Sequence, residues 1–246
     1  MGALALAFMV LPVLSLAWRA PWSRFGSELA KPEVRDALRL SLVSSFVSTF
    51  LAVLLGLPLA WILARAQFPG RRLLRAVCVL PLLMPPVASG VALLLAYGRN
   101  GTVGRSLGRI GVHLPFSTPG VILAVTFVVL PYVVLTSESA LRTADVRFED
   151  AAATLGATRS VRFRRITLPL VAPSVLGGAA LAWARALGEF GASITFAGNL
   201  PGRTQTMPIA IFLALENDPP AAIVLSLILI GVCLATLLLL RDRVLV

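Results

Sequence analysis

Six stretches of the sequence contain no Asp, Glu, Lys or Arg, and they restrict the fold more than any other feature. Each is 18 to 28 residues long and mostly apolar. They cover residues 1–18, 40–64, 76–98, 110–137, 166–184 and 219–240. A helix of about 20 apolar residues crosses a hydrocarbon layer about 30 Å thick, so each stretch is long enough to span a membrane. Helices of soluble proteins typically run to about 20 residues, and six such stretches in one chain have no soluble explanation.

The composition also indicates a membrane protein. Of the 246 residues, 58% are hydrophobic and only 13% are charged, whereas soluble domains carry about 25% charged residues. We therefore predict an all-α integral membrane protein with a single transmembrane domain over residues 1–246. The predicted spans are residues 2–18, 40–64, 76–97, 118–138, 168–192 and 220–240.

The first stretch has an alternative interpretation as a secretory signal peptide. Such a signal has a basic segment before its apolar stretch and a cleavage site with small residues after it. Here no charged side chain precedes the apolar residues, and Trp18, Arg19 and Pro21 follow them. We therefore expect a retained first helix.

Arginines in the connecting segments predict the orientation in the membrane. Cytoplasmic loops carry an excess of Lys and Arg. With six spans, segments 65–75 and 138–165 lie on the same side as both termini, and that side holds more basic residues than the other. We therefore expect both termini in the cytoplasm, although Arg19 and Arg24 beside the first stretch favour the reverse.

The segment between the fourth and fifth stretches has the pattern of a short helix followed by a turn. Residues 148–157 are rich in helix formers and open with Glu149 and Asp150, and acids suit a helix N-terminus. Gly156 stands where the helix would stop, a place where glycine commonly adopts the left-handed conformation. Two interpretations are open on physical grounds. An alanine-faced helix can dock into a groove of a partner protein, or an amphipathic helix can lie on the membrane with arginines near lipid head groups.

A motif in this segment favours the docking interpretation. Its residues are Asp150-Ala151-Ala152, three residues, Gly156, nine residues, Ile166, one residue and Leu168-Pro169. This order resembles the EAA loop of ABC importer permeases, EAA-x3-G-x9-I-x-LP, with Asp150 in place of the usual Glu and Glu149 beside it. The resemblance covers about residues 36–240. It implies the six-helix type I ABC importer permease fold, with residues 139–167 as the cytoplasmic coupling loop.

The resemblance also implies which residues contact the ATPase subunit of the transporter. In the family this loop is a coupling helix that sits in a cleft of the cytoplasmic ATPase. The residues carried over to that role are Glu149, Asp150, Ala151, Ala152, Gly156 and Arg159. The chain cannot supply the ATPase itself, because a P-loop needs a GK[ST] tripeptide and the only lysine, Lys31, lies between Ala30 and Pro32. We therefore expect two separate ATPase subunits, no cofactor in this chain, and no enzymatic activity of its own.

A second informative segment follows the fifth stretch. If the helix that includes Val171 continues past Ala184, then Arg185 and Glu189 lie one turn apart on one face and can pair. Charged residues at mid-membrane depth usually face a bundle interior or an aqueous path. The alternative is that the helix ends near Ala184 and that both side chains lie in water.

The residues around this pair indicate the solute. The sequence RALGEFGA followed by AGN-PG-T-T-P resembles the oxyanion branch of these permeases, which comprises molybdate/tungstate and sulfate/thiosulfate systems. The resemblance implies a translocation pathway formed by Arg185, Gly188, Glu189, Gly191 and Asn199. We hypothesise that Arg185 offsets the charge of the dianion and that Glu189 holds its side chain in place. Residues 201–212 look most like molybdate permeases, with sulfate or thiosulfate as the alternative.

Other classes of protein fit the sequence less well. A membrane-embedded enzyme needs a catalytic set within the spans, whereas the sole histidine, His113, is expected near the outer surface. A channel or secondary transporter would need no ATPase, and such transporters often show internal repeats that are not visible here. The net charge of +11 comes from arginines spread over membrane boundaries, so we do not expect nucleic-acid binding.

The family resemblance completes the expected assembly. It implies an extracytoplasmic oxyanion-binding protein and a second permease copy in a bacterial cytoplasmic membrane, with lipid around the spans. In the family, molybdate systems use two identical permeases and sulfate systems pair two different ones. The preferred solute therefore implies a homodimer.

Overall fold

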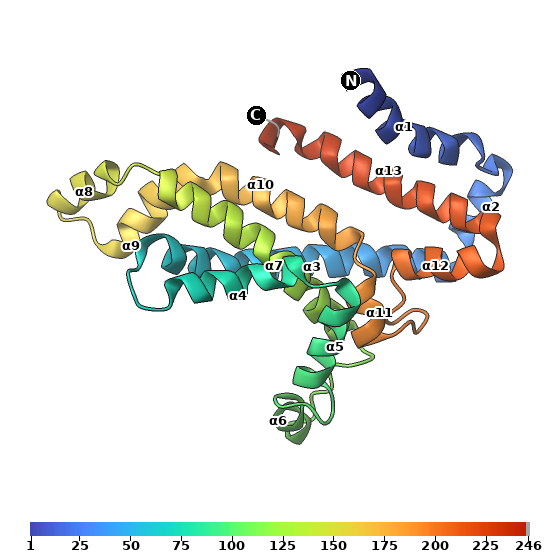
Figure 1. The fold of residues 1–246 in the computed structure, drawn as a ribbon, viewed down its shortest axis with the longest axis horizontal. Helices are drawn as coiled ribbons and strands as arrows, with labels where there is room; N and C mark the ends of the chain where they lie inside the picture. Colours follow the sequence, from blue (N-terminus) through green and yellow to red (C-terminus); the bar gives the residue numbers. More distant parts are fainter. Residues whose placement is uncertain (245–246) are drawn as a thin grey trace.

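The computed structural model describes residues 1–244, and the elements in this range are all helical. Short helices alternate with four long ones (Figure 1). In chain order the helices are α1 (Gly2–Trp18), η1 (Trp22–Arg24), α2 (Phe25–Ala30), α3 (Pro32–Arg65), α4 (Arg71–Leu83), α5 (Pro86–Tyr97), α6 (Gly104–Arg109), α7 (Thr118–Thr143), α8 (Arg147–Thr154), α9 (Arg159–Arg162), η2 (Phe163–Thr167, a π-helix), α10 (Leu168–Leu187), α11 (Gly191–Ala197), α12 (Met207–Asn217) and α13 (Pro219–Val244).

The core lies where α3, α7 and α10 pack together. The residues that fill it are small or β-branched, among them Ala52, Val121, Val125, Val129, Val133, Ala182 and Ala186. Small residues let membrane helices approach closely. Gly178 of α10 is the clearest case, because a Cβ there would overlap the Thr136 side chain of α7. Replacing this glycine would therefore push α10 away from α7.

Four helical segments are long and apolar enough to cross a membrane unbroken: Pro32–Arg65, Thr118–Thr143, Arg159–Leu187 and Pro219–Thr236. The other two possible spans are bent pairs of helices; the predicted span 2–18 is the first helix of one pair, and the predicted span 76–97 falls within the other. Gly2–Trp18 and Trp22–Ala30 meet at 65°, and Arg71–Leu83 and Pro86–Tyr97 meet at 119°. The structure therefore has up to six spans, of which two are broken.

The predicted span 76–97 differs most from the structure. It is two helices, because Pro85 and Pro86 interrupt it. Proline lacks an N–H and keeps the preceding residue out of the helical region, and Met84 is accordingly extended, with ψ of 138°. After the break, α5 and α6 project away from the long helices (Figure 1).

The predicted span 168–192 also ends earlier than expected. Helix α10 stops at Leu187, and α11 begins at Gly191. The Glu189 carboxylate lies in the gap and accepts the Ala192 N–H at 2.8 Å. A side-chain acceptor at this position satisfies one of the free N–H donors at a helix start. Ending α10 and starting α11 here therefore costs little free energy. The other spans differ mainly in their ends: α3 begins at Pro32, and α7 continues to Thr143.

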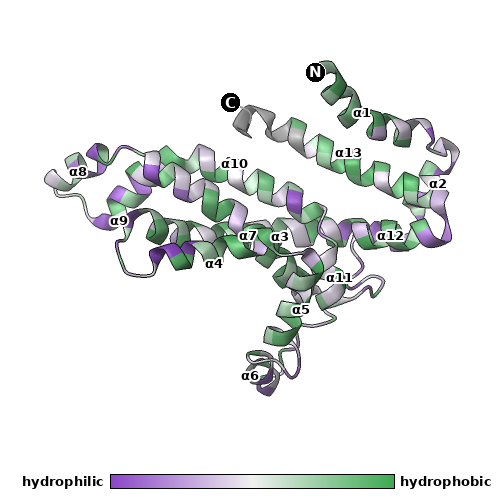
Figure 2. Cartoon of the chain, viewed as in Figure 1, coloured by the Kyte–Doolittle hydropathy of each residue, from purple (hydrophilic) through white to green (hydrophobic). Residues whose placement is uncertain are grey.

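Polar and apolar segments separate along the molecule. Hydrophilic residues gather at α8 and α9, around α2 and the start of α13, and at α6, while the long helices between them are mainly hydrophobic (Figure 2). Within the described chain, none of the side chains of α1 or α4 is buried. The exposed apolar side chains of these helices therefore face lipid or another protein chain, although α4 also contacts α7 through Arg75 and Glu138.

Candidate coupling helix and translocation site

Helix α8 lies at the tip of the molecule, beyond the ends of α3, α7 and α10 (Figure 1). The Asp145 carboxylate accepts the Arg147 N–H at 2.9 Å where the helix begins. Gly156 follows the helix with φ of +81°, the left-handed conformation that glycine adopts without strain. The short helix and glycine turn predicted from the sequence are therefore both present.

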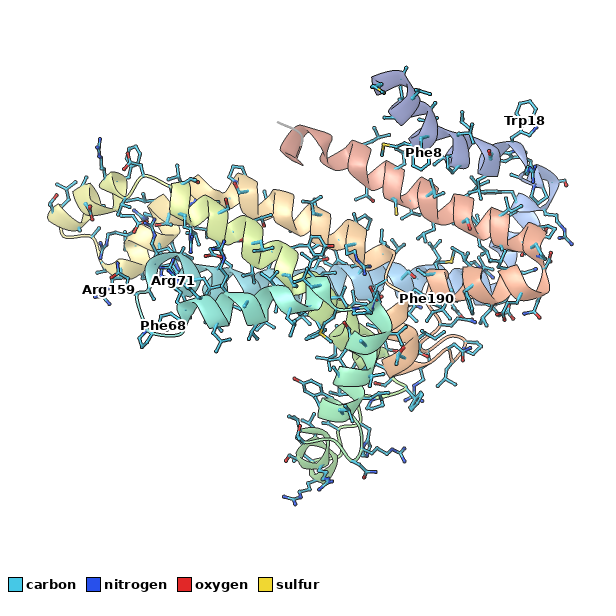
Figure 3. All side chains as sticks on the ribbon, viewed as in Figure 1. Phe8, Trp18, Phe68, Arg71, Arg159 and Phe190 are labelled. Carbon is cyan, nitrogen blue, oxygen red and sulfur yellow. The ribbon has the colours of Figure 1, made fainter. Side chains whose placement is uncertain are left out.

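Most of the predicted coupling residues face outward. Asp150, Ala151, Gly156 and Arg159 are exposed, and Ala152 is half-buried. Large apolar side chains accompany them, with Phe148 59% exposed and Leu155 88% exposed. Apolar side chains grouped at a hydrophilic tip are a common sign of a protein-binding surface. Arg159 lies at this end of the molecule together with Arg71 and Phe68 (Figure 3).

Glu149 differs from its neighbours because it turns inward. Its Oε1 lies 3.0 Å from Nη2 of Arg65, at the end of α3, and accepts a hydrogen bond from the Thr167 hydroxyl at 3.0 Å. The carboxylate thus connects α8 with the ends of two membrane helices. The structure therefore gives Glu149 an internal contact that the motif alone did not predict.

The Arg185–Glu189 pair expected from the spacing is formed. Nη2 of Arg185 lies 2.7 Å from Oε2 of Glu189, and the Glu189 side chain is only 1% exposed. The helix ends between the two residues, yet Glu189 is buried and not in open water. Its two oxygens hold different partners, since Oε2 binds the guanidinium and Oε1 accepts the N–H of Ala192. Phe190, the next residue, lies at the junction of α10 and α11 (Figure 3).

The three other predicted pathway residues lie in different surroundings. A Cβ on Gly191 would come within 2.5 Å of Cβ of Pro86, so glycine at this position allows α11 to pack against the start of α5. Gly188 is exposed, and the nearest atom to an added Cβ would be the Arg185 carbonyl oxygen at 3.9 Å. Asn199 is exposed in the loop after α11. The structure therefore groups Arg185, Glu189 and Gly191, with Gly188 beside them, and places Asn199 in a separate loop.

The sequence analysis missed two buried acids, Glu28 of α2 and Glu138 of α7, and the second lies among the long helices. Glu138 of α7 is 1% exposed and lies between two arginines, with Oε2 3.2 Å from Nε of Arg75 and Oε1 2.7 Å from Nη2 of Arg142. Glu138 follows directly after the fourth charge-free stretch, at the boundary of the predicted span 118–138, so its burial was not expected. The i,i+4 spacing to Arg142 was a usable signal, whereas Arg75 comes from α4 and only the fold brings it near.

An all-helical membrane chain with an exposed, motif-bearing helix at one end has the architecture of a transporter permease. The family model for the binding-protein-dependent transport system inner membrane component matches residues 34–244. The chain belongs to this family. It is therefore a multi-pass inner-membrane transport component and not an enzyme, and the resemblance to ABC importer permeases is confirmed.

Two similar relatives are permeases of a molybdenum and a sulfate transport system. The molybdenum transport system permease protein ModB of Mycobacterium tuberculosis is 46% identical over 227 residues, which cover 92% of this chain and 86% of the relative. The sulfate transport system permease protein CysT of Salmonella typhimurium is 35% identical over 233 residues, which cover 93% of this chain and 84% of the relative.

A solved structure supports the predicted fold. The crystal structure of a bacterial ABC transporter involved in the import of alginate contains a chain that matches with a TM-score of 0.76 at 18% identity. The match covers 97% of this chain and 88% of the other. The type I permease fold expected from the sequence is therefore confirmed.

Proposed function

We propose that this chain is the permease subunit of an ABC importer that carries molybdate, or the similar tungstate, across the bacterial cytoplasmic membrane. The observation that supports the solute most directly is the 46% identity to a molybdenum permease over 92% of the chain. Sulfate is the second candidate, because a sulfate permease is 35% identical over 93% of the chain. These solutes are tetrahedral dianions, so the same donors can serve any of them.

The exposed position of α8 (Figure 1) supports a coupling mechanism. Two ATPase subunits close on ATP and move α8, which docks on them through Asp150, Ala151, Ala152, Gly156 and Arg159. The Glu149–Arg65 contact of 3.0 Å and the continuous segment Arg159–Leu187 carry this movement into α3 and α10. This orientation places α8 in the cytoplasm. The free ends of α1 and α13 point toward the α8 end (Figure 1), which supports the proposal that both termini are cytoplasmic as well.

Two copies of the chain form the pathway, and an extracytoplasmic binding protein delivers the oxyanion to them. Support for a dimer comes from α1 and α4, which bury none of their side chains within the described chain. In this assembly Arg185 offsets the charge of the passing dianion, and Glu189 fixes the guanidinium. Gly188, Gly191 and Asn199 complete the pathway segment.

Uptake into vesicles tests the proposed solute. Vesicles that contain the chain with its ATPase and binding protein should accumulate labelled molybdate, and unlabelled tungstate should compete better than sulfate. Preferential competition by sulfate would support the second candidate, and uptake without any ATPase would contradict the ABC mechanism. The native mass of the purified membrane complex should correspond to two identical permeases and two ATPases.

Variants of Arg185 test its role separately. Arg185→Gln should lower the uptake rate, but it also leaves the buried Glu189 without its partner. The double variant Arg185→Gln, Glu189→Gln removes both charges and is the matched control for that effect. If the double variant transports at the wild-type rate with the wild-type oxyanion preference, Arg185 has no role in the pathway.

A further inference from the structure

A small cavity lies at the break between α4 and α5. Its volume is about 140 Å³, and it is enclosed on most sides. The lining residues are Pro81, Leu82, Met84, Pro86, Ser89, Val128, Tyr132 and Arg185. It is several times larger than the roughly 30 Å³ that a water molecule occupies in the liquid. It is smaller than the roughly 300–1,000 Å³ of pockets for drug-sized ligands, so its size suits a small inorganic ion.

The hydrogen-bond donors of the cavity lining favour an anion. Arg185 is the one charged residue among the lining residues in the described chain. A guanidinium has five N–H donors, and the ion pair with Glu189 is made by Nη2 at 2.7 Å. Because this contact fixes the side chain, the remaining donors are held in place without further loss of side-chain freedom.

Ser89 supplies a second donor to the cavity. It is 1% exposed, and among residues 1–244 its hydroxyl has no hydrogen-bond partner. A buried hydroxyl without a partner costs free energy. The hydroxyl of a residue that lines a cavity gains a partner when an oxygen-bearing ligand enters. Ser89 therefore indicates that the cavity binds a ligand with acceptor oxygens.

The helix that carries Ser89 adds a third favourable feature. Pro86 begins α5, a helix of 12 residues, and it also lines the cavity. The free N–H groups and the dipole at a helix start favour negative charge. In transporters with broken membrane helices, such helix starts commonly point toward anionic groups of the substrate. The proline break thus places a helix start beside Arg185 within the membrane-spanning part of the chain.

We propose that this cavity is a transit site for one tetrahedral oxyanion, bound by Arg185, the Ser89 hydroxyl and the start of α5. The proposal rests on the proposed function and specifies where the substrate pauses inside the permease. The site binds weakly, because the Arg185–Glu189 pair is neutral overall and attracts the dianion only through oriented donors. Weak binding suits transport, since the ion must also leave.

The decisive variant is Ser89→Ala, with Ser137→Ala as the matched control. Ser137 is also buried with a hydroxyl that has no partner in the described chain, but it does not line the cavity. A hydrogen bond to a charged group contributes about 1.5 kcal/mol or more. Ser89→Ala should therefore lower the maximal rate of molybdate uptake about tenfold, whereas Ser137→Ala should transport at the wild-type rate.

The half-saturating molybdate concentration is set by the binding protein and should stay constant in both variants. Crystals of the permease–ATPase complex soaked in tungstate should show an anomalous peak between Arg185 and Ser89, and the peak should weaken in Ser89→Ala. Equal uptake by Ser89→Ala and wild type, or no tungstate at this place, would overturn the transit site while leaving the importer assignment intact. If the wild-type assembly takes up no oxyanion at all, the proposed function itself is wrong.

Discussion

At the scale of single residues, the adjacent acids Glu149 and Asp150 lie in different surroundings, and we expect them to have separate tasks. Glu149 contacts Arg65 and Thr167, each at 3.0 Å, whereas Asp150 is exposed. Glu149→Gln should lower the melting temperature of the purified permease, because a hydrogen bond to a charged group contributes about 1.5–3 kcal/mol. Asp150→Asn makes the same chemical change on the outer face. The Asp150→Asn variant should have the wild-type melting temperature but should co-purify with less ATPase. The opposite pattern would show that the two roles are reversed.

The ion pairs of Glu138 provide a second prediction at this scale. Arg75 connects α4 with α7 through Glu138 at 3.2 Å. Arg75→Gln should loosen α4 and expose Cys78, one turn further along that helix. Arg75 is half exposed, and Glu138 keeps Arg142 as a partner in this variant. The loss should therefore cost no more than the roughly 1 kcal/mol of a solvent-accessible ion pair, and we expect labelling of Cys78 by a maleimide to accelerate up to about fivefold, measured in a Cys233→Ser background. Arg72→Gln removes an exposed arginine from the same helix and should leave the rate unchanged; equal acceleration by both variants would contradict the proposed contact.

The sequence could predict residue contacts only where both partners lie within one helical turn. The Arg185–Glu189 pair was predicted because its spacing is four residues, although the helix ends before Glu189. Arg65 and Glu149 are separated by 84 positions, and Arg75 meets Glu138 from another helix. Nothing in local periodicity connects such residues. The sequence could not predict that the buried Ser89 hydroxyl has no hydrogen-bond partner in the described chain, because this depends on the shape of the cavity.

At the scale of helices, two glycines of the same segment make a matched test. A Cβ at Gly191 would lie 2.5 Å from Cβ of Pro86, whereas at Gly188 its nearest neighbour would be at 3.9 Å. Gly191→Ala should force α11 away from α5 and destabilise the permease, because overpacking typically costs about 1–3 kcal/mol. Thermal unfolding should show a lower midpoint for Gly191→Ala and little change for Gly188→Ala. An unchanged midpoint in Gly191→Ala would mean that α11 does not pack as the structure shows.

The same scale shows how far hydrophobic runs predict helices. Runs 40–64 and 219–240 lie within α3 and α13, which charged residues continue beyond the runs, whereas α7 begins at Thr118, inside run 110–137, and continues past it to Thr143. Run 76–98 has the length of a span but is divided at Pro85 and Pro86 into helices that meet at 119°. Length and apolarity indicate that a segment enters the membrane. They do not determine its path, which depends on the backbone conformation allowed at the two prolines.

At the scale of the whole molecule, the two ends should bind different partners. Leu155 is 88% exposed beside α8, and Leu200 is 44% exposed in the loop after α11. Burying a leucine at an interface stabilises it by about 1.5–3 kcal/mol, so Leu155→Ser should weaken ATPase binding at least about tenfold. Leu200→Ser makes the same change in the loop after α11, which the proposed orientation puts on the extracytoplasmic side, and this variant should still bind the ATPase. Pull-down of the ATPase from detergent-solubilised membranes measures both. The proposed orientation rests on α8 as the helix that docks on the ATPase. Retention of the ATPase by Leu155→Ser would contradict this docking site. Loss of the ATPase in Leu200→Ser would place the docking site near the loop after α11 and reverse the proposed orientation.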